Sequence, residues 1–124
     1  MASVPFDQMQ GVIWLNGSLV DWQDAKIHIL SHGLHYGGSV FEGERAYGGK
    51  IFKSKEHTER FRKSAQIMDF DLPFSDAEIN AAKDKVVELN GGGDQYVRPV
   101  AWRGSEMMAV SAQHNKIHVA IATW

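Results

Sequence analysis

The 124-residue sequence has no cysteine, and its 13 basic and 15 acidic residues leave a formal net charge of only −2. The absence of cysteine excludes disulfides, thiolate metal ligands and a cysteine nucleophile. A chain so nearly neutral has no electrostatic footprint for nucleic acid or for an anionic membrane, so we expect neither partner. No apolar run reaches membrane-spanning length and no signal-peptide pattern opens the sequence, which predicts a cytoplasmic protein.

The apolar residues that are present, 44% of the chain, suffice for the core of a single domain. The last apolar segment, Ile117–Thr123, is followed only by Trp124. Because a strand that ends on a bare tryptophan has no polar tail, we expect a larger protein to continue beyond it.

Apolar segments separated by turn residues predict several strands. Residues 13–15 and 18–20 are joined by Asn16-Gly17, which is the strongest short-range signal of a β-hairpin. Further strands are expected at 26–30, 39–47, 51–52, 96–102 and 117–123, with the glycine-punctuated segment 33–38 as a bend.

Two segments have helical periodicity. The first runs from residue 56 to about 68, with Ser54 as a candidate N-cap. The second begins at a Ser75/Glu78 capping box and ends near Asn90-Gly91. Its expected apolar stripe is Ile79, Ala82, Val86 and Leu89. Strands, two helices and then strands predict an α+β fold, a two-layer sandwich of a mainly antiparallel sheet with two helices.

Two arginines are candidate anion-binding residues. In a strand, Tyr96 and Arg98 share a face, and a half-buried arginine requires either a bound carboxylate or one of the chain's own acids. Arg60 lies near a helix N-terminus, where it could share a phosphate with backbone N–H groups. From local pattern alone, a solvated Arg60 within a charged run is the stronger interpretation.

Other chemistry is weakly supported. His28, His32 and His35 have spacing that could suggest a metal-binding module, but no carboxylate or thiolate accompanies them. No lysine lies in an apolar context that would lower its pKa for Schiff-base chemistry, and Lys26 comes closest. The glycine-rich run around Tyr36 and Phe41 fits either a tight bend or the wall of a pocket.

Four segments together resemble the branched-chain amino acid aminotransferases of the fold-type IV, pyridoxal-phosphate-dependent enzymes. They are Ser-His-Gly-Leu-His-Tyr-Gly-Gly-Ser-Val-Phe-Glu-Gly-Glu-Arg at 31–45, Ile-Trp-Leu-Asn-Gly at 13–17, Glu-His-Thr-Glu-Arg at 56–60 and Tyr-Val-Arg-Pro at 96–99. The superfamily also contains D-amino-acid aminotransferases and aminodeoxychorismate lyases. Phe41-Glu42-Gly43 with Arg45, and the Tyr96/Arg98 pair, favour the branched-chain branch.

The resemblance implies that residues 1–124 are the small N-terminal domain, with pyridoxal 5'-phosphate at the boundary with a C-terminal domain. That second domain would supply the Schiff-base lysine, so the 124 residues alone would be inactive. The whole protein would transfer amino groups from leucine, isoleucine or valine to 2-oxoglutarate, and would form a homodimer or higher oligomer. The resemblance assigns Arg60 to the cofactor phosphate, Tyr96 and Arg98 to the substrate carboxylate, and Phe41 to the side-chain pocket. It places Tyr36, Met108, Ala109 and Val110 in the neighbouring subunit's site.

Two positions depart from the family pattern. Glu44 replaces a residue that is commonly aliphatic, so we expect the outer face of its strand to be more solvated. Ala109 replaces a frequent glycine in the substrate loop, which leaves the side-chain preference open.

Overall fold

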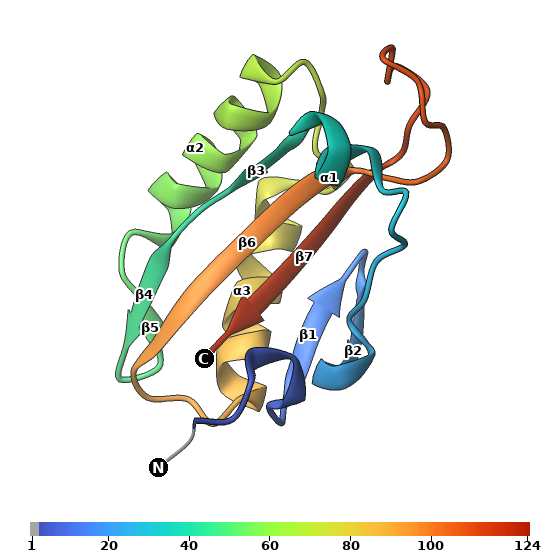
Figure 1. Ribbon diagram of the computed structural model, residues 1–124. Helices are drawn as coiled ribbons and strands as arrows, with labels where there is room; N and C mark the ends of the chain where they lie inside the picture. Colours follow the sequence, from blue (N-terminus) through green and yellow to red (C-terminus); the bar gives the residue numbers. More distant parts are fainter. Residues whose placement is uncertain (1–2) are drawn as a thin grey trace.

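The computed structural model describes residues 3–124 as a single seven-stranded sheet with two long helices against one face (Figure 1). The sheet order is β2-β1-β7-β6-β4-β5, β3 also pairs with β6, and every pairing is antiparallel. The strands are β1 (Val12–Leu15), β2 (Ser18–Asp21), β3 (Ser39–Phe41), β4 (Glu44–Tyr47), β5 (Lys50–Ile51), β6 (Gln95–Arg103) and β7 (Ile117–Thr123). The helices are α1 (His32–Tyr36), α2 (Ser54–Ile67) and α3 (Asp76–Leu89), with 3₁₀ turns at Phe6–Gln8 and Trp22–Asp24. The α+β sandwich is confirmed.

The β1–β2 hairpin is confirmed at the expected turn. Asn16 and Gly17 both have positive φ, 51° and 95°, as a type I′ turn requires. Trp14 of this hairpin is buried and meets Phe74 edge-on at a centroid distance of 4.8 Å. The hairpin is therefore tied to the segment that leads into α3.

The segment 39–47, expected as one strand, is interrupted at Glu42 and Gly43. The Glu42 N–H donates to the Pro99 carbonyl at 3.0 Å, but Pro99 has no N–H with which to complete the pair. The register nevertheless continues across the interruption, because Phe41 pairs with Val100 and Glu44 with Val97. Side chains therefore alternate between the two faces of the sheet from β3 into β4.

Both long helices form where expected, but one start differs. Ser75 and Glu78 make the reciprocal capping box of α3, each bond 3.1 Å long. The N-cap of α2 is Lys53, in the left-handed region with φ 58°, so the expectation for Ser54 was wrong. Ser54 is the first helical residue, and its hydroxyl caps nothing.

The apolar stripe of α3 is partly confirmed. Ile79, Ala82 and Val86 are buried, whereas Leu89 is 45% exposed. Leu89 is the last residue of α3 and lies at the margin of this stripe, whereas the buried face extends on its other side to Lys83 and Val87.

Residues 26–30 form no strand, contrary to expectation, and the following bend is the five-residue helix α1. Residues 26–30 pair with no strand of the sheet, in which β7 lies between β1 and β6. Gly37, with φ 72°, ends α1. A helix this short has no periodic pattern from which it could be predicted.

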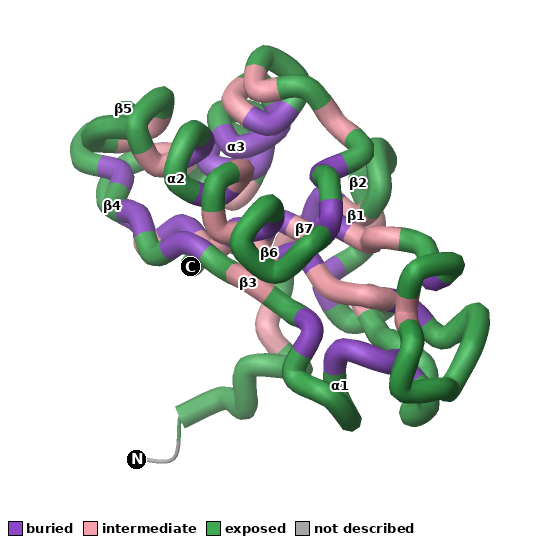
Figure 2. Tube along the Cα trace, turned by 90° about the horizontal axis from the view of Figure 1, so that it is seen from above, coloured by how far each residue is buried: buried purple, intermediate pink, exposed green. Residues whose placement is uncertain are grey.

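Burial divides the sheet into two faces. Seen from above, α2 and α3 lie on one side of the sheet and α1 on the other (Figure 2). The core between the sheet and the long helices includes Phe61, Ile79, Val97 and Ile121, all 0% exposed. The opposite face carries the alternate residues of β6, which are only half-buried. Within residues 3–124, no helix has the length and apolar character needed to cross a membrane.

Candidate functional site

Phe41, Tyr96 and Arg98 meet on the sheet face that the long helices leave open. The Arg98 guanidinium carbon lies 4.1 Å from the centroid of the Phe41 ring. The Tyr96 hydroxyl accepts hydrogen bonds from Arg98 Nε and Nη2 at 3.1 and 2.9 Å. Strand alternation places Tyr96 and Arg98 on this face, as expected, and the β3–β6 register brings Phe41 to them.

Arg98 forms no ion pair with any carboxylate of residues 3–124. Of the two interpretations open from the sequence, the pairing with an internal acid is therefore not observed in the described part of the chain. A guanidinium braced by a phenol and an aromatic face retains donors for an anion. Its planar fork suits a carboxylate.

Gly43 makes room for this arrangement. A Cβ at position 43 would lie 2.6 Å from the Tyr96 hydroxyl oxygen, well inside van der Waals contact. The glycine thus allows the phenol to reach Arg98, and any larger residue would displace it.

An apolar hollow of about 410 Å³ lies on the same face. Its lining residues are Ile27, Gly33, Leu34, Ser39, Val100, Trp102 and Ala120. Val100 and Trp102 follow Arg98 at alternate positions of β6, so the hollow continues along the strand from the arginine. The open face therefore combines an anion-binding group with an apolar surface.

Tyr36 and the loop residues 108–110 gather separately, beside the end of β6 where α1 packs. Tyr36 stacks on His32 at 4.6 Å, and His32 Nε2 contacts the Ala109 carbonyl oxygen at 2.7 Å. Tyr36, Met108 and Val110 are exposed by 52%, 39% and 82%. The structure joins these residues to one another through His32 but does not bring them to Arg98.

Arg60 lies on the other face of the sheet, on α2. Its Nε and Nη2 donate to the two oxygens of Glu42 at 2.8–3.2 Å. Burial tends to raise the pKa of Glu42, but hydrogen bonds from Arg60 and His57 outweigh this and lower it. Arg60 is thus neither free nor merely solvated, although 66% of its side chain remains exposed.

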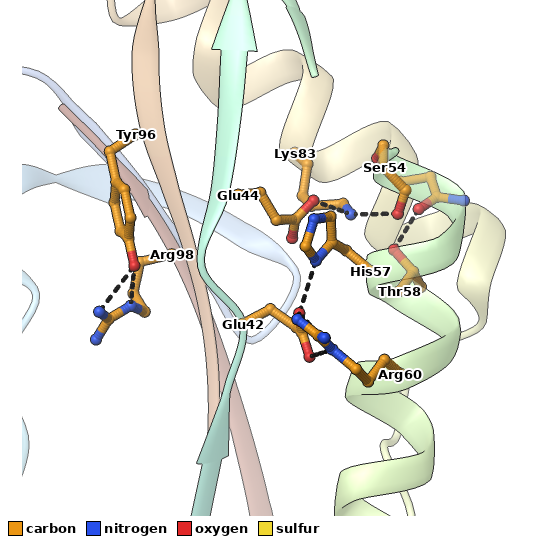
Figure 3. A network of polar contacts seen from close by, with 10 residues as sticks. Glu42, Glu44, Ser54, His57, Thr58, Arg60, Lys83, Tyr96 and Arg98 are labelled. Atoms are coloured by element: carbon orange, nitrogen blue, oxygen red, sulfur yellow. Dashed lines mark hydrogen bonds and ion pairs between the residues drawn. The ribbon is translucent and has the colours of Figure 1, made fainter. Parts of the chain in front are cut away.

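Glu44 is buried, which corrects the expectation of a more solvated strand face. Its Oε1 accepts from Lys83 Nζ at 2.8 Å (Figure 3). Both side chains are fully buried. Burial raises the pKa of Glu44 despite the hydrogen bond from Lys83. Lys83 is buried as well, and its ammonium group donates to Glu44 and to the Ser54 carbonyl. The sequence did contain a signal for this burial. Because side chains alternate along a strand, Glu42, Glu44 and Ala46 must lie on the face opposite to Phe41.

The three histidines of the metal hypothesis contact backbone groups of their own segment or the nearby loop. His28 Nδ1 accepts from the Leu30 N–H at 3.0 Å, and His35 Nε2 contacts the Ile29 carbonyl at 2.7 Å. His32 Nε2 contacts the Ala109 carbonyl oxygen.

Comparisons with known proteins agree with this geometry. The family model "Amino-transferase class IV" matches residues 39–124. The probable branched-chain-amino-acid aminotransferase of Rickettsia felis is 45% identical over 122 residues, which are 98% of this chain and 42% of that protein. The branched-chain-amino-acid aminotransferase of Pseudomonas aeruginosa is 48% identical over 118 residues, 92% of this chain and 38% of its own length.

Solved structures show the same likeness. The branched-chain amino acid aminotransferase from Escherichia coli superposes with a TM-score of 0.88 at 37% identity, covering 94% of this chain and 41% of that one. The chain is also similar to a T.th. branched-chain amino acid aminotransferase complexed with N-(5'-phosphopyridoxyl)-L-glutamate, with a TM-score of 0.88 at 42% identity, covering 93% of this chain and 41% of that one. The chain spans about two fifths of the length of these relatives. By sequence and by fold, the chain belongs to the class IV aminotransferase family.

Proposed function

We propose that this chain is the N-terminal domain of a pyridoxal-phosphate-dependent branched-chain amino acid aminotransferase. The observation that carries the proposal is Arg98, a guanidinium braced by Phe41 and Tyr96 without a carboxylate partner in residues 3–124. The relatives that match nearly the whole chain support the same activity. A C-terminal domain of the same protein would complete the site.

The residues of the chain fit a phosphorylated cofactor. Glu42 accepts hydrogen bonds from Nε and Nη2 of Arg60. No hydrogen bond within residues 3–124 involves Arg60 Nη1. Arg60 therefore retains donors for the phosphate of pyridoxal 5'-phosphate. When bound, this cofactor supplies the electron sink of transamination.

The chain itself would bind and orient the substrate. Arg98 would hold the α-carboxylate, and the Tyr96 hydroxyl fixes the guanidinium in place. Phe41 and the adjoining apolar hollow would accept a branched aliphatic side chain, because burying such a group is favourable and a charged one is not. Fixing the carboxylate and the side chain together limits the orientations of Cα.

Tyr36 and residues 108–110 would serve a second subunit. They are exposed, joined to one another through His32, and separate from the Arg98 cluster. We therefore propose a homodimer in which this group reaches the partner's site, with branched-chain amino acids and 2-oxo acids as the small-molecule partners.

The test uses a hybrid protein in which this chain replaces the matching segment of the Pseudomonas aeruginosa relative. The hybrid should develop visible cofactor absorbance and transfer amino groups from leucine, isoleucine or valine to 2-oxoglutarate. Arg98→Met should lower kcat/KM about 10- to 100-fold by removing charge-assisted hydrogen bonds, while the cofactor spectrum persists. Lys63→Met, which removes an exposed positive charge on α2, is the matched control.

Other outcomes would redirect the assignment. Loss of the cofactor spectrum in Arg98→Met would overturn the division of labour between Arg98 and Arg60. Failure with all three branched-chain amino acids, together with pyruvate release from aminodeoxychorismate, would indicate a lyase. Activity with D-amino acids instead would indicate a D-amino-acid aminotransferase.

A further inference from the structure

Glu42 is a nearly fully buried carboxylate whose partners all come from α2. Only 3% of its side chain is exposed, and it lies where the pairing of β3 and β4 is interrupted. Its Oε1 is 2.7 Å from His57 Nδ1 and 2.8 Å from Arg60 Nη2, and its Oε2 is 2.9 Å from Arg60 Nε. Figure 3 shows this group on the opposite side of the strand from Tyr96 and Arg98.

The proton positions in this group follow from the charges. The hydrogen bonds from Arg60 and His57 favour an ionised Glu42, which can only accept hydrogen bonds. His57 Nδ1 must therefore carry a hydrogen and donate it to Oε1. Because both carboxylate oxygens accept hydrogen bonds, Glu42 has one stable orientation. The fixed carboxylate in turn fixes the orientation of the Arg60 guanidinium.

The arginine that results is exposed but not free to rotate. An exposed arginine ordinarily samples many rotamers, and fixing it on binding an anion costs free energy. Two contacts from one guanidinium edge to a buried carboxylate fix both the position and the plane of the group. Nη1 takes no part in this contact. The Arg60 side chain is therefore already ordered before an anion binds, and binding does not have to supply the free energy of ordering it.

We propose that Glu42, itself oriented by His57, is a positioning residue for Arg60 and raises the affinity of the domain for the cofactor phosphate. This inference rests on the proposed function. Electrostatics alone predicts the reverse, because a carboxylate beside Arg60 repels a phosphate. The two effects have opposite signs, so a single measurement separates them.

The experiment compares pyridoxal 5'-phosphate with pyridoxal, which lacks the phosphate, in the hybrid protein described above. Glu42→Gln should weaken pyridoxal 5'-phosphate binding about 2- to 10-fold, the range expected for one side chain that must now be ordered on binding. It should leave the affinity for pyridoxal unchanged. In an Arg60→Met background, Glu42→Gln should have no further effect on the ratio of the two affinities.

Glu44→Gln is the matched control. Glu44 is buried on the same face of the sheet, at the start of β4, but contacts Lys83 rather than Arg60. A general loss of folding in Glu42→Gln would weaken both ligands together, and Glu44→Gln would reproduce that pattern without a phosphate-specific change.

A readout in the 124-residue chain alone does not depend on the cofactor. The Arg60 Nε–H should give a sharp nitrogen–proton NMR signal that exchanges slowly with water, and Glu42→Gln should broaden or abolish that signal. Unchanged or tighter pyridoxal 5'-phosphate binding in Glu42→Gln would overturn the positioning role. Absence of cofactor binding by the unmutated hybrid would instead overturn the proposed function.

Discussion

Replacing Lys83 by methionine would leave the Glu44 carboxylate buried without its partner. Both side chains are fully enclosed and their charged atoms are 2.8 Å apart, so no water is available to replace the ammonium group. Removing one member of such a pair costs about 3–5 kcal/mol. Loss of the hydrogen bond from Lys83 Nζ to the Ser54 carbonyl, 2.9 Å long, adds about 1 kcal/mol.

The companion double variant Glu44→Leu/Lys83→Met removes both charges together. It leaves an apolar pair in an apolar layer, and such replacements are neutral or stabilising by about 1–4 kcal/mol. We therefore expect the free energy of unfolding to fall sharply in the single variant and to recover most of that loss in the double variant, which still lacks the hydrogen bond to the Ser54 carbonyl.

Urea unfolding of the 124-residue chain at neutral pH, followed by tryptophan fluorescence, measures both values. The deficit of Lys83→Met should shrink as the pH falls, because Glu44 can then be protonated and its burial already raises its pKa. A single-variant cost below about 1 kcal/mol would match a solvated surface pair and would refute the reasoning. A double variant as unstable as the single variant would refute it too.

Three further predictions concern other parts of the chain. Because the folded-state pKa of Glu42 is lowered, its contribution to stability is present at neutral pH and is lost as the pH falls; Glu42→Gln should therefore flatten the loss of unfolding free energy between neutral pH and about pH 3 in urea titrations. Gly43→Ala should displace the Tyr96 hydroxyl and raise the KM of the hybrid protein for leucine about tenfold, with the urea midpoint little changed; an unchanged KM would contradict the close approach. Ser75→Ala should destabilise the chain by about 1 kcal/mol by removing a capping bond, whereas Ser105→Ala in an exposed loop should have no measurable effect.

Local signals predicted most of the fold. The turn at Asn16-Gly17 and the capping box at Ser75 and Glu78 depend on neighbours in sequence, and both form as expected. The start of α2 and the helix α1 were not predicted, because each depends on tertiary contacts. Gly33, for example, lies in α1 where a Cβ would approach the Trp102 Cβ to 3.1 Å.

The candidate site was predictable in part, for the same reason. Alternation along β6 places Tyr96 and Arg98 on one face. No sequence pattern shows whether a carboxylate of the chain pairs with Arg98. The partnership of Arg60 with Glu42 joins residues 18 apart, and that of Lys83 with Glu44 joins residues 39 apart. Pairings of this kind arise from packing of α2 and α3 on the sheet, so only a three-dimensional structure reveals them.

The unbroken register across the interrupted β3–β4 junction makes this short stretch a two-sided template for protein engineering. Phe41 and Arg45 can be varied to change the chemistry of the open face, while Gly43 must stay small beside the Tyr96 hydroxyl and Glu42 and Glu44 keep their contacts with the helices. A single inserted or deleted residue would exchange the two sets, turning both carboxylates toward the open face. Length variation should therefore be tolerated at the β4–β5 turn and selected against between Phe41 and Glu44.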